Sequence, residues 1–126
     1  MLCILYKIEW ADNGVYWKYY GDISGREIIE VSQLIYDDPR FAKIKYKLVD
    51  FLDIDSINLS KDEAAEIVGL HKAAALSNGN IETAVVTSSN GELANKFSFF
   101  FSNLCWEFFV FQDREKGNNW LTSKCT

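Results

Sequence analysis

The stretch IKYKLVDF, residues 44–51, and the helix-opening sequence SKDE, residues 60–63, decide the fold. The first is rich in β-branched and aromatic residues, which favour an extended strand, and it leads into an acidic loop. The second is a capping box, in which a serine hydroxyl and a glutamate carboxylate satisfy backbone N–H groups at a helix start. A strand, a loop and a helix in this order make up half of a βαβ unit.

The hydrophobic pattern of the whole chain predicts strands and helices in the order ββαβαβαβα. Capping boxes at Ser24, Ser60 and Ser89 open three helices, and a short helix ends the chain. The predicted strands cover residues 2–10, 15–21, 44–51, 83–87 and 106–111. This alternation predicts a single α/β domain over residues 1–126, with a mixed, mostly parallel sheet of about five strands.

One face of this sheet is expected to be partly exposed to water. Lys45 and Lys47 alternate with apolar residues in the central strand, and Lys7 and Glu9 do so in the first. A sheet covered on both faces would have continuous apolar strands, so we expect the helices mainly on one face. The exposed face would still carry four apolar or aromatic residues suited to self-association or to an apolar ligand: Leu5, Tyr16, Tyr20 and Val49.

Composition narrows the class of protein. The formal net charge of −5 argues against nucleic acid or anionic membranes as main partners. The three cysteines show no CxxC spacing, which indicates a reducing compartment. The N-terminus lacks a signal-peptide pattern, and the apolar run 97–106 is too short to span a bilayer. We therefore expect a soluble cytoplasmic protein.

The order of elements resembles the STAS/SpoIIAA-like superfamily, the fold of the anti-sigma factor antagonists. It resembles more closely the small stand-alone bacterial proteins grouped as SpoIIAA-like, whose fold is related to the CRAL-TRIO fold. The segments that carry the resemblance are spread over almost the whole chain: residues 21–24, 37–41, 48–51, 59–63, 111–113 and 120–121. The resemblance implies a binding and regulatory module without catalysis and without a cofactor.

In the antagonists a partner kinase phosphorylates a serine at the mouth of the second helix, and Ser60 occupies about that place. The resemblance therefore makes Ser60 the candidate phosphoacceptor. The neighbouring candidates for an interaction corner are Asp53, Asp55, Ser56, Asn58 and Lys61. The antagonists have an Asp-Ser-Ser-Gly type run where this chain has Asn58-Leu59-Ser60-Lys61, so a lysine replaces the small glycine.

Each candidate also has a purely structural explanation. Ser60 is predicted to be a helix N-cap, a role compatible with phosphorylation. His71 is the only histidine and falls on the apolar stripe of its helix, as a hydrogen-bonded core residue would. Asp50, Asp53 and Asp55 could bind a divalent cation, but solvated loop acids are the simpler interpretation and we predict no metal site.

The aromatic residues concentrate near the C-terminus. Phe97 and Phe101 fall on the apolar stripe of the third predicted helix, and Phe99 does not. We therefore expect the first two to be buried and Phe99 to be exposed. An apolar surplus of this kind is typical of a dimer contact or a hydrophobic pocket.

The favoured function is a non-catalytic, STAS-type module that binds a protein partner or a second copy of itself. The alternative is a carrier or sensor of a small apolar or lipid-like ligand, which the aromatic residues and the CRAL-TRIO relation favour. An enzyme would have only His71 and the acidic residues to support it.

Overall fold

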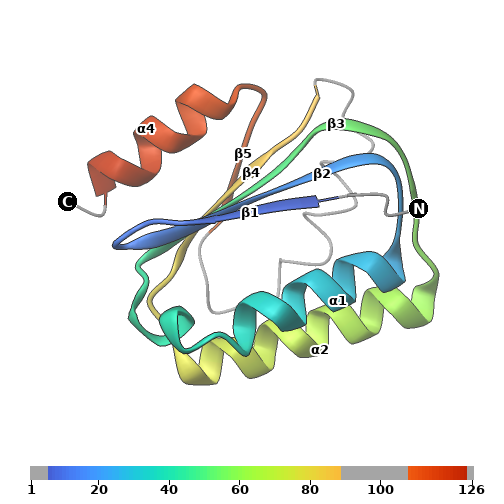
Figure 1. Ribbon diagram of the computed structural model, residues 1–126, viewed down its shortest axis with the longest axis horizontal. Coiled ribbons are helices and arrows are strands. Elements are labelled where there is room, and N and C mark those ends of the chain that lie inside the picture. The colour runs from blue at the N-terminus through green and yellow to red at the C-terminus, as the bar shows by residue number, and fades with distance from the viewer. Residues whose placement is uncertain (1–5, 89–107, 125–126) are drawn as a thin grey trace.

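Five strands form one sheet in the computed structural model, which describes residues 6–88 and 108–124 (Figure 1). The strands are β1 Tyr6–Trp10, β2 Gly14–Ser24, β3 Tyr46–Asn58, β4 Glu82–Val86 and β5 Phe108–Phe111. They lie side by side in chain order. The β1–β2 pair is antiparallel and the other three pairs are parallel, which confirms the predicted mixed, mostly parallel sheet.

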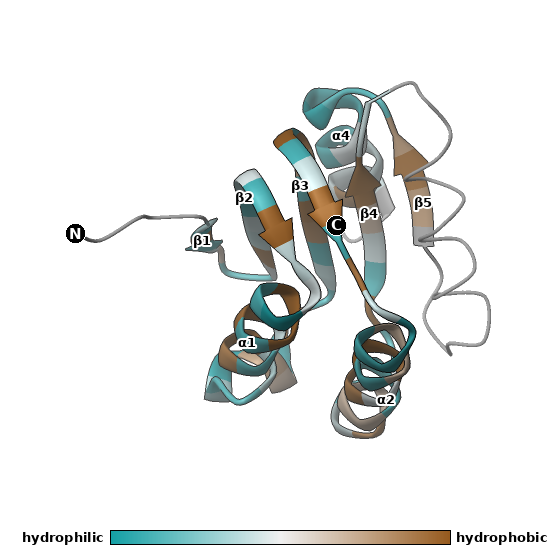
Figure 2. Cartoon of the chain, turned by 90° about the vertical axis from the view of Figure 1, so that its right-hand side faces the viewer, coloured by the Kyte–Doolittle hydropathy of each residue, from teal (hydrophilic) through white to brown (hydrophobic). Residues whose placement is uncertain are grey.

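The helices are unequally divided between the two faces of the sheet. The two longer helices, α1 (Gly25–Tyr36) and α2 (Lys61–Ser77), lie together on one face, and α4 (Arg114–Lys124) lies on the other (Figure 2). A short 3-10 helix, Pro39–Lys43, follows α1. This arrangement confirms that the described helices lie mainly on one face. The helix expected to begin at Ser89 lies outside the described residues, as do Phe97, Phe99 and Phe101.

Helix α1 begins and ends at residues that the sequence marks. Ser24 is its N-cap, and its hydroxyl oxygen accepts a hydrogen bond from the Glu27 N–H. The helix ends before Asp37 and Asp38, whose successor Pro39 disfavours the helical conformation in the residue before it. The predicted apolar stripe is buried at Ile28, Val31 and Ile35. Leu34 was assigned to the same stripe, but 55% of it is exposed.

Strand β3 is covered on both faces, which corrects the expected solvent exposure of one of them. Lys47 and Val49 face the helices α1 and α2, and Lys47 is only 1% exposed. On the other face, Tyr46 and Leu48 pack with Leu121 of α4. Lys45 is exposed, but it precedes the strand. The alternation was real, but it was assigned to the wrong face because a lysine inside a central strand can extend into the core.

The segment expected to be an acidic loop is also part of β3. Residues 52–58 continue the parallel pairing with β2, as far as the pair Ser24 and Asn58. Two register irregularities, one of them beside Gly21 at φ +69°, accompany this extension. Side chains here alternate between half-buried and exposed, so acidic residues are tolerated on the exposed side. Strand hydrogen bonding uses the main chain, which explains why the acidic side chains did not end the strand.

The rotation of α1 about its own axis can be tested by truncating one side chain on its buried face and one on its exposed face. Ile29 is fully buried and Leu34 is mostly exposed. Ile29→Ala should lower the free energy of unfolding by about 2–5 kcal/mol, because it leaves a cavity in the core. Leu34→Ala should lower it by less than about 1 kcal/mol, as expected for an exposed site. Urea melts of both variants measure the difference, and equal losses would show that the helix is rotated.

Candidate interaction corner

The ends of β2 and β3 place two helix N-termini at one corner of the molecule. Ser24 ends β2 and pairs with Asn58, the last residue of β3. Helix α1 begins directly after Ser24, and α2 begins at Lys61, so both helices start beside each other and run back along the same face (Figure 1). We call this region, residues 22–27 and 56–63, the interaction corner.

Ser60 is the N-cap of α2, and its capping box is complete. The Ser60 Oγ accepts a hydrogen bond from the Glu63 N–H at 3.1 Å, and Glu63 Oε1 accepts one from the Ser60 N–H at 3.0 Å. The backbone hydrogen bond from Ser60 lowers the pKa of Glu63, so this side chain is a carboxylate at neutral pH. Ser60 itself is exposed to solvent. The sequence therefore predicted the cap, its partner and the start of this helix.

The two helix starts are in close contact. A Cβ atom added at Gly25 would lie 2.7 Å from Leu59 Cδ1 and 2.8 Å from Glu63 Cβ, so only glycine fits without a shift. Outside this contact, Arg26 of α1 and Glu66 of α2 form an exposed ion pair at 2.9 Å. The corner is thus a packed junction whose outer side carries Ser60 and charged side chains.

The other predicted corner residues do not all gather there. Asn58 and Lys61 flank Ser60 within two residues and are exposed. Ser56 is exposed and donates a hydrogen bond from its hydroxyl to Asp22 Oδ1 at 2.6 Å. Asp55 is exposed. Asp53 lies further back along β3, where its carboxylate pairs with Lys18 at 2.8 Å.

Three residues of the corner were not among the predicted site residues. Ser24 caps α1, Gly25 permits the close contact, and Glu63 closes the capping box. The capping-box pattern predicted the local roles of Ser24 and Glu63. Their proximity could not be predicted, because it depends on the pairing of β2 with β3.

The three acidic residues interpreted as solvated loop acids lie in different environments, and for Asp50 that interpretation was wrong. The carboxylate of Asp50 is fully buried next to Lys18 and Arg114, and Asp55 is exposed elsewhere on the strand. Within the described residues, no group of three or more histidine, cysteine, aspartate or glutamate side chains could hold a metal ion. No helix of this part of the chain is long and apolar enough to cross a bilayer.

His71 belongs to a polar network within the core. Its Nδ1 and the Tyr36 hydroxyl share a hydrogen bond of 2.5 Å, and that hydroxyl oxygen accepts one from Lys47 Nζ at 2.9 Å. Burial lowers the pKa of His71 well below its usual value, and the neighbouring Lys47 lowers it further. Burial likewise lowers the pKa of Lys47. The network joins α1, α2 and β3 beneath the helices, where it acts as a packing element.

The pKa of His71 predicts a pH dependence of stability. The folded protein keeps the imidazole neutral, whereas the unfolded chain protonates it at a pKa of about 6.5. Below that pH the unfolded state binds more protons, so the free energy of unfolding falls as pH falls. His71→Asn keeps a side chain that can hydrogen-bond with Tyr36 and removes the titration. Between pH 7.5 and 5 the parent should lose stability relative to this variant by up to about 1.4 kcal/mol per pH unit below 6.5.

Urea melts of parent and variant at matched pH measure this difference. Taking the difference cancels the titration of carboxylates that both proteins share. A constant difference across the range would mean that His71 is protonated as easily in the fold as in the unfolded chain.

Two hollows lined by residues within 6–88 and 108–124 bear on the alternative of an apolar carrier site. A surface hollow of about 720 Å³ runs along α1, and its lining includes four carboxylates: Glu27, Glu30, Asp37 and Asp38. The apolar cavity under the helices, beside Lys47 and His71, measures about 20 Å³. That volume is about enough for one water molecule. The alternative of an apolar ligand is therefore not favoured by either hollow.

The structure has a SpoIIAA-like fold. An uncharacterized protein of the DUF3478 family with a SpoIIAA-like fold, from Shewanella loihica PV-4, matches with a TM-score of 0.59 at 22% identity, over 96% of this chain and 98% of that one. The anti-sigma factor antagonist SpoIIAA in its unphosphorylated form matches with a TM-score of 0.61 at 9% identity, over 93% and 97% of the two chains.

The phosphorylated form of the Bacillus cell fate determinant SpoIIAA matches with a TM-score of 0.57 at 10% identity, over 90% of this chain and 97% of that one. No family model and no curated protein matches the sequence. Identities this low establish the fold, and function has to be argued from the site.

Proposed function

We propose that this protein is a non-catalytic regulatory module that binds a protein partner through the interaction corner, with Ser60 as the phosphoacceptor. The observation that carries the proposal is the exposed Ser60 hydroxyl at the start of α2, next to the start of α1. The SpoIIAA-like fold supports it, because SpoIIAA is an anti-sigma factor antagonist with unphosphorylated and phosphorylated forms.

A phosphate on Ser60 would rearrange the capping box without unfolding the helix. It adds about −1.5 to −2 charges at neutral pH and three strong acceptor oxygens. The free N–H groups and the dipole of the α2 N-terminus stabilise such a charge. Glu63 now accepts from the Ser60 N–H and would be repelled from it by the phosphate. Phosphorylation therefore exchanges one anion at the helix start for a stronger one that extends into solvent.

Two exposed cations of the interaction corner, Lys61 and Arg26, offer contacts for acidic groups of a partner, although the four acidic residues of the corner outnumber them: Asp22, Glu27, Asp62 and Glu63. Lys61 is exposed directly after Ser60, and Arg26 lies exposed on the adjoining helix. Lys61 stands where the antagonists have a small glycine, so a partner meets an ammonium group there. A phosphate beside Lys61 would compensate its charge and repel an acidic partner. Binding should therefore weaken on phosphorylation, while the fold changes little.

Two substitutions at Ser60 distinguish control of binding by phosphorylation from a purely structural role as the N-cap. Ser60→Ala removes the cap and should cost about 1 kcal/mol of stability, with no added charge and no loss of partner binding. Ser60→Asp keeps a good N-cap and adds a negative charge, so it should keep the melting temperature and lose partner binding. The measurements are thermal melts and the amount of partner retained by each immobilised variant.

Ser24→Asp is the matched control, because it adds the same charge at the N-cap of the neighbouring helix. It should retain more partner than Ser60→Asp. If Ser60→Asp binds the partner as well as the parent does, Ser60 is only a cap and the proposed switch is wrong.

A further inference from the structure

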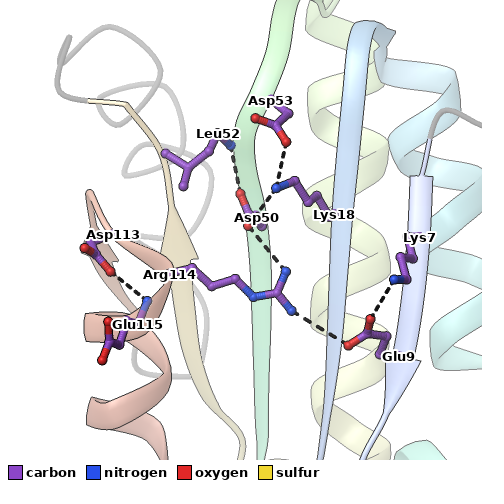
Figure 3. Close-up of polar contacts among 9 residues, drawn as sticks. All are labelled: Lys7, Glu9, Lys18, Asp50, Leu52, Asp53, Asp113, Arg114 and Glu115. Carbon is purple, nitrogen blue, oxygen red and sulfur yellow. Dashed lines mark hydrogen bonds and ion pairs between the residues drawn. The ribbon is translucent and has the colours of Figure 1, made fainter.

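The face of the sheet opposite α1 and α2 is covered by α4 only in part. Helix α4 packs on β3, β4 and β5, and its first residue, Arg114, extends across β3 towards β2 and β1 (Figure 3). A polar pocket of about 120 Å³ lies between this side chain and the strands β1 and β2. The side chains that line it include Lys7, Glu9, Tyr16, Lys18, Tyr20 and Arg114.

The buried carboxylate of Asp50 lies close to two of these cations, Lys18 and Arg114. Asp50 is fully buried, and its Oδ1 accepts a hydrogen bond from the Leu52 N–H at 2.9 Å. Among residues 6–88 and 108–124 its Oδ2 has no hydrogen-bond partner, although Lys18 Nζ and Arg114 Nη1 each lie 3.6 Å away. A buried charge is stable only when it is compensated, so Asp50 holds these two cations near one point.

Within the described residues, the guanidinium N–H donors of Arg114 have only distant acceptors. Its guanidinium makes ion pairs at 3.6 Å with Asp50 and 3.9 Å with Glu9, and it makes no side-chain hydrogen bond to any residue within 6–88 and 108–124. It lies above the ring of Tyr16, with 5.7 Å between the guanidinium carbon and the ring centroid. A guanidinium carries five N–H donors in a planar fork that matches a carboxylate or a phosphate.

We propose that this pocket binds one small oxyanion group, a carboxylate or a phosphate, on the Arg114 guanidinium with help from Lys18 and Lys7. The volume of about 120 Å³ is enough for one such group together with a few water molecules. The site lies on the face opposite α1 and α2 and is independent of the function proposed for Ser60.

Glu9 lies where an oxyanion would meet Arg114. Its carboxylate is the anion nearest to Arg114 on the solvent side, at 3.9 Å, and its side chain is 50% exposed. Lys7 holds Glu9 at 3.0 Å, and Asp53 holds Lys18 at 2.8 Å. Three cations and three carboxylates thus balance before a ligand enters: Lys7, Lys18 and Arg114 against Glu9, Asp50 and Asp53. An entering oxyanion displaces Glu9 from Arg114, so binding should be weak and should strengthen when Glu9 is neutral.

Titration with inorganic phosphate and with acetate at constant ionic strength tests this site. The side-chain N–H resonance of Arg114 is followed by NMR in ¹⁵N-labelled full-length protein. The shift should saturate in the millimolar range with at least one of the two anions. Glu9→Gln should bind several times more tightly, and Arg114→Gln should weaken binding roughly tenfold or more. For Arg114→Gln the backbone amide of Lys18 reports binding.

Arg114→Lys keeps a cation beside Asp50, and it replaces Arg114→Gln in the titration if Arg114→Gln does not fold. It should fold and bind more weakly than the parent, because a lysine lacks the planar fork. Arg40→Gln is the control, since Arg40 already forms a bidentate pair with Asp38. It should leave the titration unchanged.

A non-saturating shift, or equal titrations of the parent and Arg114→Gln, would overturn the proposal and leave a pocket that holds water only. If N-acetyl-O-phosphoserine amide saturates the site as inorganic phosphate does, the oxyanion can be carried on a protein. If only the free anions saturate it, the ligand is a small molecule.

Discussion

The parallel pairing of β2 with β3 is the constraint on which the rest of the structure depends. It runs from Gly14 and Tyr46 at one end of the two strands to Ser24 and Asn58 at the other. Because both strands end together, the helices that follow them start together and return along the same face of the sheet. The close contact at Gly25 is a consequence of this register, and so is the position of the Ser60 hydroxyl beside the start of α1.

The same strand pair supports one buried ionisable group on each face. Lys47 points towards the helices, where the Tyr36 hydroxyl accepts its hydrogen bond. Asp50, three residues later, points the other way, where Lys18 and Arg114 compensate its charge. Both groups cost free energy to bury, and both connect elements that are distant in the sequence. The Lys47 network joins two helices to the sheet, and the Asp50 cluster joins the first residue of α4 to the outer strands.

Local patterns in the sequence predicted much of the fold and part of the corner. The capping boxes at Ser24 and Ser60 marked the helix starts, because each depends on residues within one turn. The burial of Lys47 could not be predicted, since its partners Tyr36 and His71 come from two helices elsewhere in the chain.

The acidic residues after Phe51 indicated a loop, but the main chain there pairs with β2 whatever the side chains are. The cluster around Asp50 could not be predicted either, because its partners Lys18 and Arg114 come from distant parts of the chain. A charged residue inside an apolar strand signals a buried ion pair, but it does not say which cations will reach it.

Amide hydrogen exchange across β3 tests most directly whether the β2–β3 register places the two helix starts together. The account predicts that the alternate amides of residues 53–58 that donate to β2, and those of residues 20–24 that donate to β3, exchange far more slowly than amides of an unstructured chain. Exchange of residues 53–58 at the rate of an open loop would contradict it, because Ser60 would then not be held beside the start of α1.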